Sequence, residues 1–265
     1  MIYLTESLAK EVLTGKRDEI EVSLDLGRSR KKVKRKLLLG IQLEKVSGDF
    51  VYLWDGKALF KAAIARKHYY RLRMMSGFPV LEIDGLRMQL VKEFKNPMEY
   101  SKLVALKLGI GPGQKVLDTC AGLGYTAIAA AAKGAEVETF EKDPNVIEIA
   151  KINPWSAELF ADKRIKFHEG DAFSGIRQMA GKRFDRILHD PPRFSLAEEL
   201  YSPGFYRELF RVAAEGARLF HYVGSIGKMR GRHFENGVAE RLAEAGWKKI
   251  RRDVKLQGLF ALKPE

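Results

Sequence analysis

From residue 97 onward, apolar strand-like segments alternate with helical ones, and no other feature of the sequence constrains the fold as much. Strands that alternate with helices form right-handed βαβ units, which assemble into a parallel sheet with helices on both faces. We therefore predict a doubly wound, Rossmann-like α/β domain over residues 96–265. The predicted strands are Lys115–Cys120, Glu136–Glu141, Ile165–Gly170, Arg183–His189, Ala217–Ile226, Trp247–Lys255 and Gly258–Leu262, and the predicted helices are Tyr125–Lys133, Pro144–Phe160 with a break before Pro154, Phe173–Met179, Pro203–Glu215 and Phe234–Ala245.

Residues 1–95 have a different pattern, which predicts a small, mainly β domain with one helix. Asp84-Gly85 lies between two apolar runs, and this dipeptide is a strong signal for a β-hairpin. We expect strands at Glu19–Gly27, Ile41–Val46, Phe50–Trp54, Phe78–Ile83 and Leu86–Val91, and a helix at Ala58–Met75.

Charge and cysteine content limit the possible partners and the compartment. The chain has 47 Lys and Arg against 34 Asp and Glu, and its net charge of +13 favours a polyanion, nucleic acid before membrane. No apolar run approaches the roughly 18 residues of a membrane span. A single Cys excludes an internal disulfide and fits a reducing cytoplasm. The abundance of Lys, Arg and Glu also suggests a heat-adapted source.

Ligands of doubly wound sheets bind beyond the carboxyl ends of the strands, so we examined each strand end for polar residues. The first predicted strand ends in Asp118, followed by Gly122 and Gly124. Glycines allow a tight turn and close approach of the backbone to a ligand, although such a turn also occurs without any ligand. Asp118 at this place favours a cationic group over a phosphate.

Acidic residues follow two further strands. Glu141 ends the second strand, where a carboxylate can accept hydrogen bonds from both hydroxyls of a ribose. Asp171 follows the third strand and can accept a hydrogen bond from an adenine amino group. Acidic residues at three successive strand ends, together with the glycine turn, predict a nucleoside pocket.

The fourth strand is followed by Asp190-Pro191-Pro192. The two prolines fix φ and remove two N–H donors, so the loop presents only acceptors, namely the Asp190 carboxylate and backbone carbonyls. Such a site suits an NH2 group, because it can bind both N–H bonds and orient the nitrogen lone pair toward an electrophile. The alternative is a rigid turn without catalytic function.

The order of these motifs, Asp-x-Cys-x-Gly-x-Gly, an acidic residue, Gly-Asp-Ala and Asp-Pro-Pro, resembles class I S-adenosylmethionine-dependent methyltransferases over residues 97–265. The Asp-Pro-Pro loop is similar to that of exocyclic amino methyltransferases. More narrowly, the chain resembles archaeal proteins linked to N4-methylation of cytidine in small-subunit ribosomal RNA. The resemblance implies a seven-stranded sheet whose last strand is antiparallel. It also implies that Asp118, Gly122 and Gly124 hold the methionine end of S-adenosylmethionine, Glu141 its ribose, Asp171 and Ala172 its adenine, and Asp190 with Pro191 and Pro192 the target amino group.

One departure from the family pattern concerns the residue after the two prolines, where amino methyltransferases usually have an aromatic side chain. Here Arg193 occupies this position and Phe194 follows, and either could stack on a base. We expect RNA contacts from the basic run at residues 28–36 and from the mixture of basic and aromatic residues around Tyr70, although a solvated surface and a packed helix explain these as well. The predicted contacts are Arg193, Phe194, Arg30, Lys32, Lys34, Lys67 and Tyr70.

Four alternative functions remain open. The target could be guanine N2 or adenine N6 of RNA, and a protein or small-molecule N-methyltransferase would share every cofactor residue. An aminopropyltransferase of the same fold would need an acidic channel for its substrate. A non-catalytic RNA-binding protein would not need Asp118, Glu141, Asp171 and Asp190.

Cysteine and histidine side chains are assigned to packing or left without a role. Cytosine-C5 chemistry needs a thiol near the target loop, and residues 189–195 contain none, so we expect Cys120 to pack beneath the glycine turn. His189 precedes Asp190, and side-chain alternation turns it away from the cleft. The five histidines show no metal-binding spacing.

Overall fold

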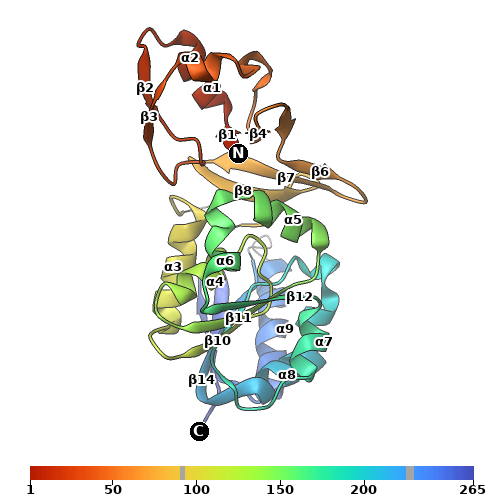
Figure 1. Ribbon diagram of the computed structural model, residues 1–265. Helices are drawn as coiled ribbons and strands as arrows, with labels where there is room; N and C mark the ends of the chain where they lie inside the picture. Colours follow the sequence, from red (N-terminus) through yellow and green to blue (C-terminus); the bar gives the residue numbers. More distant parts are fainter. Residues whose placement is uncertain (90–92, 225–229) are drawn as a thin grey trace. The chain divides into compact units, whose positions relative to one another are not determined.

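The computed structural model describes residues 1–89, 93–224 and 230–265. These residues form two compact units, whose helices and strands are labelled in Figure 1. The first unit comprises Met1–Pro97 with Asn145–Ala157, and the second comprises Met98–Pro144 with Glu158–Glu265.

The second unit is built on a seven-stranded sheet. The spatial order is β12 (Ile165–Glu169), β11 (Glu136–Glu141), β10 (Lys115–Asp118), β13 (Phe184–His189), β14 (Ala213–Tyr222), β16 (Gly258–Leu262) and β15 (Lys248–Asp253). Neighbours from β12 to β14 are parallel, and β16 is antiparallel to both β14 and β15. The predicted doubly wound sheet is therefore confirmed, together with its antiparallel last strand.

Helices connect these strands where the alternation predicted them, and one further helix precedes the sheet. The helices of this part of the chain are α3 (Pro97–Leu108), α4 (Tyr125–Ala131), α5 (Pro144–Ile152), α6 (Ala157–Ala161), α7 (Ala172–Arg177), α8 (Pro203–Val212) and α9 (Arg230–Glu244). The sequence analysis missed α3. The expected break before Pro154 is confirmed, because α5 ends at Ile152 and Pro154 begins a short 3₁₀ turn (Pro154–Ser156). β14 begins at Ala213, within the predicted helix, and the predicted end of this strand at Ile226 lies outside the described residues.

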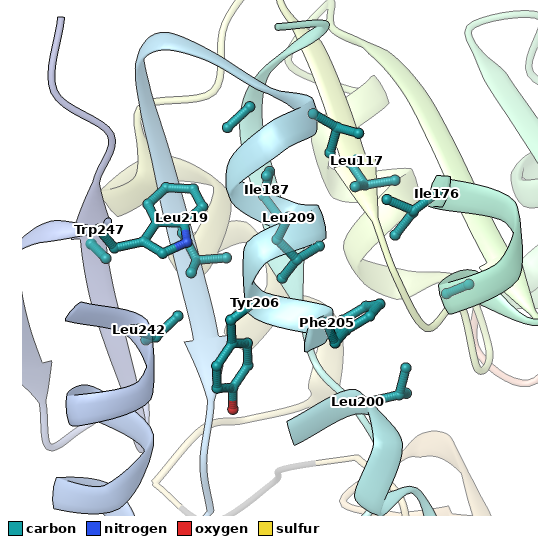
Figure 2. Close-up of a cluster of buried hydrophobic side chains, with 14 of the residues drawn as sticks. Leu117, Ile176, Ile187, Leu200, Phe205, Tyr206, Leu209, Leu219, Leu242 and Trp247 are labelled. Carbon is teal, nitrogen blue, oxygen red and sulfur yellow. The ribbon is translucent and has the colours of Figure 1, made fainter. Parts of the chain in front are cut away.

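Helix α8 shows how the second unit forms its core. Ser202 caps the helix by accepting a hydrogen bond from the N–H of Phe205. Phe205, Tyr206 and Leu209 lie on one side of the helix and are fully buried. Figure 2 shows them in one cluster with side chains of the sheet, such as Ile187 and Leu219, and with Leu242 and Trp247. Burying each such side chain contributes about 1.5–3 kcal/mol, so this helix is fixed by its apolar face.

The first unit contains small sheets and short helices. β1 (Ile2–Leu4), β4 (Tyr52–Trp54) and β5 (Leu59–Lys61) form one sheet, β2 (Glu19–Val22) and β3 (Lys31–Lys34) form a hairpin, and β6 (Ala63–Ala65), β7 (Tyr69–Met75), β8 (Phe78–Ile83) and β9 (Leu86–Arg87) form a four-stranded sheet. Two helices, α1 (Glu6–Thr14) and α2 (Lys36–Leu39), pack with them, and neither was predicted. The hairpin predicted at Asp84-Gly85 is confirmed between β8 and β9, whereas Leu90 and Val91 lie outside the described residues.

Two predictions for the first unit are wrong. The segment Ala58–Met75 is not a helix, because it contains β5, β6 and β7. Along β7 the buried Tyr70 and Leu72 alternate with Arg71 and Arg73, which pair with Glu82 of the neighbouring strand. These cross-strand contacts override the helix propensity of the alanines. Ile41–Val46 is not a strand, because Leu43–Lys45 forms a 3₁₀ turn.

Residues Asn145–Ala157 belong to the first unit through specific contacts. The side chain of Arg66 donates a hydrogen bond to Asn145 (2.8 Å) and forms an ion pair with Glu148 (3.1 Å). The ring of Trp155 lies 4.3 Å from that of Phe78, centroid to centroid, and its Nε1–H donates to the carbonyl of Leu26 (2.9 Å). A sequence-based boundary at residue 95 could not include this distant segment.

Within the described ranges, every helix is too short or too polar to cross a membrane.

Candidate active site

The predicted site residues of the second unit lie at the carboxyl ends of its parallel strands. β10 and β13 are neighbours at the point where the chain changes direction across the sheet, and Asp118 pairs in register with Thr139 of β11 and Leu188 of β13. Glu141 ends β11, and Asp190 directly follows β13. The carboxyl ends of these parallel strands therefore form the site that the strand-end rule predicts.

Asp118 is a fully buried carboxylate at the base of this site. Its Oδ2 accepts hydrogen bonds from the hydroxyls of Thr126 (3.0 Å) and Thr139 (3.1 Å), whereas its Oδ1 has no hydrogen-bond partner among the described residues. Burial raises the pKa of Asp118 to about 7, although the threonine hydroxyls oppose this shift. A buried acceptor without a donor is costly, so Asp118 is suited to a cationic or N–H-bearing ligand.

The glycine turn after β10 is connected to Glu141. The N–H of Gly122 donates to Oε2 of Glu141 (2.9 Å), and the N–H of Asp143 donates to Oε1 (3.0 Å). Burial raises the pKa of Glu141, and these backbone hydrogen bonds oppose the shift. Each carboxylate oxygen retains a second lone pair, so Glu141 can still accept hydrogen bonds from two hydroxyls.

Gly124 is required for the packing of the turn. Its φ is +80°, and a Cβ at this position would lie 2.7 Å from Cδ2 of Leu159. Helix α4 begins immediately after it. The structure thus explains Gly124 through local geometry, independently of any ligand.

Asp171 and Ala172 lie where β12 leads into α7. Asp171 caps this helix, because its Oδ2 accepts hydrogen bonds from the N–H (2.9 Å) and the hydroxyl (2.8 Å) of Ser174. Its Oδ1 accepts no hydrogen bond from the described part of the chain. Ala172 is buried in the hydrophobic core, so only its backbone can contact a ligand.

Asp190 is partly buried, and no described residue donates a hydrogen bond to it. Burial raises its pKa to about 7, with a further contribution from the charge of Asp118. The carbonyl of Pro192 accepts a hydrogen bond from the Tyr201 hydroxyl (2.9 Å). This hydrogen bond and the two prolines hold the loop in place. The Asp190 carboxylate itself receives no hydrogen bond from the described residues, so it can accept one from a ligand.

His189 fixes the end of β13 from the other side. One ring nitrogen, Nε2, lies 3.0 Å from the carbonyl of Leu200, which can only accept, so Nε2 carries the proton. Nδ1 therefore accepts a hydrogen bond from the Thr119 hydroxyl at 2.7 Å. Burial lowers the pKa of His189 to about 3, and the expectation that this residue packs away from the cleft is confirmed.

The two residues after the prolines differ in their surroundings. Arg193 is exposed, and its guanidinium makes no ion pair or hydrogen bond with the described residues, whereas its carbonyl accepts a hydrogen bond from the N–H of Leu196 (2.8 Å). Phe194 is 40% exposed, and its ring packs edge-to-face against those of Tyr201 (5.5 Å) and Phe234 (5.7 Å). Both side chains remain accessible to a substrate.

The predicted RNA contacts of the first unit differ in their exposure. Lys32, Lys34 and Lys67 are exposed, and Arg30 is exposed but donates to the carbonyl of Glu21 (2.6 Å). Tyr70 is only 3% exposed, so its assignment as a substrate contact is wrong. Its ring belongs to the buried face of β7, which the helical interpretation of this segment did not anticipate.

Three tyrosines near Asp190 were missed by the sequence analysis. The charge of Asp190 contributes to raising the pKa of Tyr100, Tyr201 and Tyr222, behind the larger effect of burial. Tyr222 ends β14, so the strand-end rule could have identified it. Tyr100 lies in α3 and Tyr201 in a 3₁₀ turn (Glu198–Tyr201), and neither has a local sequence signal.

Metal ligands and a nucleophilic cysteine are not features of this site. The described residues contain no cluster of His, Cys, Asp and Glu that could hold a metal ion. Cys120 packs against the hydrophobic core, and burial raises the pKa of its thiol well above the usual value.

Comparison with known proteins places this geometry in context. The family described as "Conserved hypothetical protein 95" matches residues 102–201. MJ0928 of Methanocaldococcus jannaschii, named provisionally as a protein N5-glutamine methyltransferase, is 33% identical over 121 residues, which are 45% of this chain and 57% of that protein. The spermidine synthase of Thermotoga maritima has a similar fold, with a TM-score of 0.59 and 18% identity over 78% of this chain and 74% of that chain.

A longer match comes from MJ1233 of Methanocaldococcus jannaschii, described as an uncharacterized protein. It is 45% identical over 285 aligned positions, which cover 100% of this chain and 96% of that protein. The chain therefore belongs to the same family as MJ1233, with the Rossmann-like fold of methyltransferases.

Proposed function

We propose that the acceptor of this S-adenosylmethionine-dependent methyltransferase is an exocyclic amino group of an RNA base, specifically cytidine N4 in small-subunit ribosomal RNA. The Asp190 carboxylate carries this proposal. It lies at the end of the central strand β13, lacks a hydrogen-bond donor from the described residues and is followed by two prolines that offer no N–H. A site of this kind selects a group that donates hydrogen bonds.

The residues at the neighbouring strand ends fit the cofactor. S-adenosylmethionine supplies an electrophilic methyl group on a positively charged sulfur. The open Oδ1 of Asp118 suits the ammonium group of the methionine end, next to the turn at Gly122 and Gly124. Glu141 is placed for the ribose hydroxyls, and Asp171 with the backbone of Ala172 for the adenine.

Asp190 prepares the acceptor nitrogen for attack. The lone pair of an exocyclic amino group is delocalised into the base, and hydrogen bonds from its N–H groups to Asp190 and the Pro191 carbonyl favour a tetrahedral nitrogen. S-adenosylmethionine, when bound, would supply the methyl group, and its carbon–sulfur bond would break as the bond from this nitrogen to the methyl carbon forms. The methylated nitrogen becomes acidic and releases its proton afterwards, so positioning and charge placement contribute most of the catalysis.

RNA is favoured as the acceptor by charge and by the exposed side chains next to the loop. The net charge is +13, and Arg193 and Phe194 are accessible for stacking on a base that has left its helix. The amide of a protein glutamine also presents an NH2 group, and the partial match to MJ0928 makes it the second candidate. At 18% identity the spermidine synthase of Thermotoga maritima shows a likeness of fold alone, and a basic chain does not favour a polyamine substrate.

The test is methyl transfer from labelled S-adenosylmethionine to small-subunit ribosomal RNA, bulk tRNA and a protein extract, followed by nucleoside mass spectrometry. We expect label in N4-methylcytidine or N4,N4-dimethylcytidine of the ribosomal RNA. Label in another amino nucleoside would show that the target base is not cytosine. Label in protein alone would refute RNA as the acceptor.

Asp190→Ala tests the role of the loop in the same assay. We expect turnover to be abolished while the affinity for S-adenosylmethionine changes little, because Asp190 faces the acceptor. Glu244→Ala removes an exposed carboxylate from α9 and serves as the matched control. Near-normal turnover of Asp190→Ala would refute the assignment of Asp190.

A further inference from the structure

The register of β13 and β14 places Tyr222 beside Asp190. His189 and His221 pair in register, and their ring centroids lie 4.2 Å apart, so the two side chains share one face of the sheet. Side chains alternate along a strand, so the next residues, Asp190 and Tyr222, project to the opposite face. The charge of Asp190 raises the pKa of Tyr222, after the effect of burial, which agrees with this proximity.

The hydroxyl of Tyr222 differs from those of the two other tyrosines near Asp190. The Tyr100 hydroxyl donates to the carbonyl of Leu256 (3.4 Å), and the Tyr201 hydroxyl donates to the carbonyl of Pro192 (2.9 Å). Across residues 1–89, 93–224 and 230–265, the Tyr222 hydroxyl has no hydrogen-bond partner. Because Tyr222 is only partly buried, its hydroxyl is a donor that a ligand beside Asp190 can reach.

We propose that the Tyr222 hydroxyl donates a hydrogen bond to the ring nitrogen next to the target amino group and thereby helps to select the base. This inference rests on the proposed function. In cytosine the amino group is flanked by the acceptor N3, and in adenine it is flanked by N1. An acceptor (Asp190) beside a donor (Tyr222) matches this pair of groups and orients the plane of the base. Uracil has a carbonyl in place of the amino group and an N–H in place of N3, so both contacts would be mismatched.

The experiment compares two substrates with two enzymes. The first substrate is an RNA oligonucleotide that carries the target cytidine in unmodified form, and the second has 3-deazacytidine at that position, in which N3 is replaced by C–H. We expect the wild-type enzyme to lose about tenfold in kcat/KM on the deaza substrate, the size of one neutral hydrogen bond. Tyr222→Phe should lose the same factor on cytidine and show no further loss on 3-deazacytidine.

Two readouts separate this role from a general structural effect. The affinity of Tyr222→Phe for S-adenosylmethionine should equal that of the wild type, because Tyr222 faces the acceptor side. Tyr3→Phe, which removes a hydroxyl from the first unit, should keep the full tenfold sensitivity to the deaza substitution. If the labelled nucleoside is adenosine, 1-deazaadenosine replaces 3-deazacytidine in the same comparison.

The outcomes distinguish this inference from the proposed function. If wild-type enzyme methylates RNA but Tyr222→Phe remains as sensitive as the wild type to the deaza substitution, the role of Tyr222 is refuted and the proposed function stands. If wild-type enzyme methylates no RNA, the proposed function fails and this inference fails with it.

Discussion

The affinity for S-adenosylmethionine should depend on pH through Asp118. This carboxyl is fully buried, its Oδ1 has no donor among the described residues, and its pKa is raised to about 7 by burial. The ionised form is the one that attracts an ammonium group. With a pKa near 7, roughly 90% of the carboxyl is ionised at pH 8 and roughly 10% at pH 6. We therefore expect Kd to be about tenfold higher at pH 6 than at pH 8.

The raised pKa of Asp118 also predicts that the free energy of unfolding depends on pH. Between pH 3.8 and about 7 the folded protein keeps the proton that the unfolded chain has released. The folded state then binds more protons, so the free energy of unfolding falls as the pH rises through this window. This decrease in the free energy of unfolding is complete above pH 7 and amounts to at most about 4 kcal/mol, at 1.36 kcal/mol per pH unit. Asp118→Asn removes the buried charge and should stabilise the ligand-free protein at pH 8 by about 2–4 kcal/mol.

Isothermal titration calorimetry at pH 6, 7 and 8 and guanidinium unfolding at pH 8 test these expectations. Asp118→Asn should bind S-adenosylmethionine more weakly than the wild type at pH 8 and lose the dependence on pH. Asp190→Asn is the control for the second carboxyl with a pKa near 7, and it should keep the part of the pH dependence that comes from Asp118. A wild-type Kd that is constant from pH 6 to 8, or an Asp118→Asn variant that binds like the wild type, would refute the reasoning.

Two further predictions concern stability. Gly124→Ala should lower the free energy of unfolding by about 2–4 kcal/mol, because φ is +80° and the new Cβ would lie 2.7 Å from Cδ2 of Leu159. An unchanged melting temperature would contradict this. Adding Leu159→Ala to the variant should leave the part of the loss that comes from backbone strain. Glu82→Gln should destabilise the first unit by about 2–3 kcal/mol at pH 7, because Glu82 is 4% exposed and is bonded to Arg71 (2.6 Å) and Arg73 (2.9 Å). Those arginines lower the pKa of Glu82, so the stability that the Glu82 carboxylate contributes is present at neutral pH and is lost on acidification. Equal urea midpoints for the variant and the wild type at pH 7 would contradict this prediction.

The sheet of the second unit could be predicted because its strands are specified locally. Buried parallel strands read as short apolar runs, such as Val116-Leu117, and the structure has β11 with the predicted bounds Glu136–Glu141. The carboxylates of the site could be found for the same reason, since the topology brings the ends of these strands together. Thr126 and Thr139, which bond to Asp118, are visible only once β10 and β11 are paired.

The first unit could be predicted less well because its structure depends on contacts between distant segments. The segment Ala58–Met75 has residues with high helix propensity, and it forms strands because β5 pairs with β4, β6 with β7 and β7 with β8. Trp155 packs on Phe78 across a long sequence separation, so no local pattern marks residues 145–157 as part of this unit. Helix α1 has a recognisable cap at Thr5, which the sequence analysis did not use.

We expect Asp118 and Asp190 to connect cofactor binding to acceptor binding. Burial raises the pKa of Asp190, and the charge of Asp118 adds to this shift, so an ionised Asp118 favours the protonated form of Asp190. A positive charge held at Asp118 offsets this repulsion and lowers the pKa of Asp190. Asp190 then becomes an acceptor for both N–H groups of the target, and by linkage the acceptor strengthens cofactor binding by the same factor. We therefore predict that S-adenosylmethionine and the acceptor bind cooperatively through the electrostatics of these two strand ends, without movement of the chain.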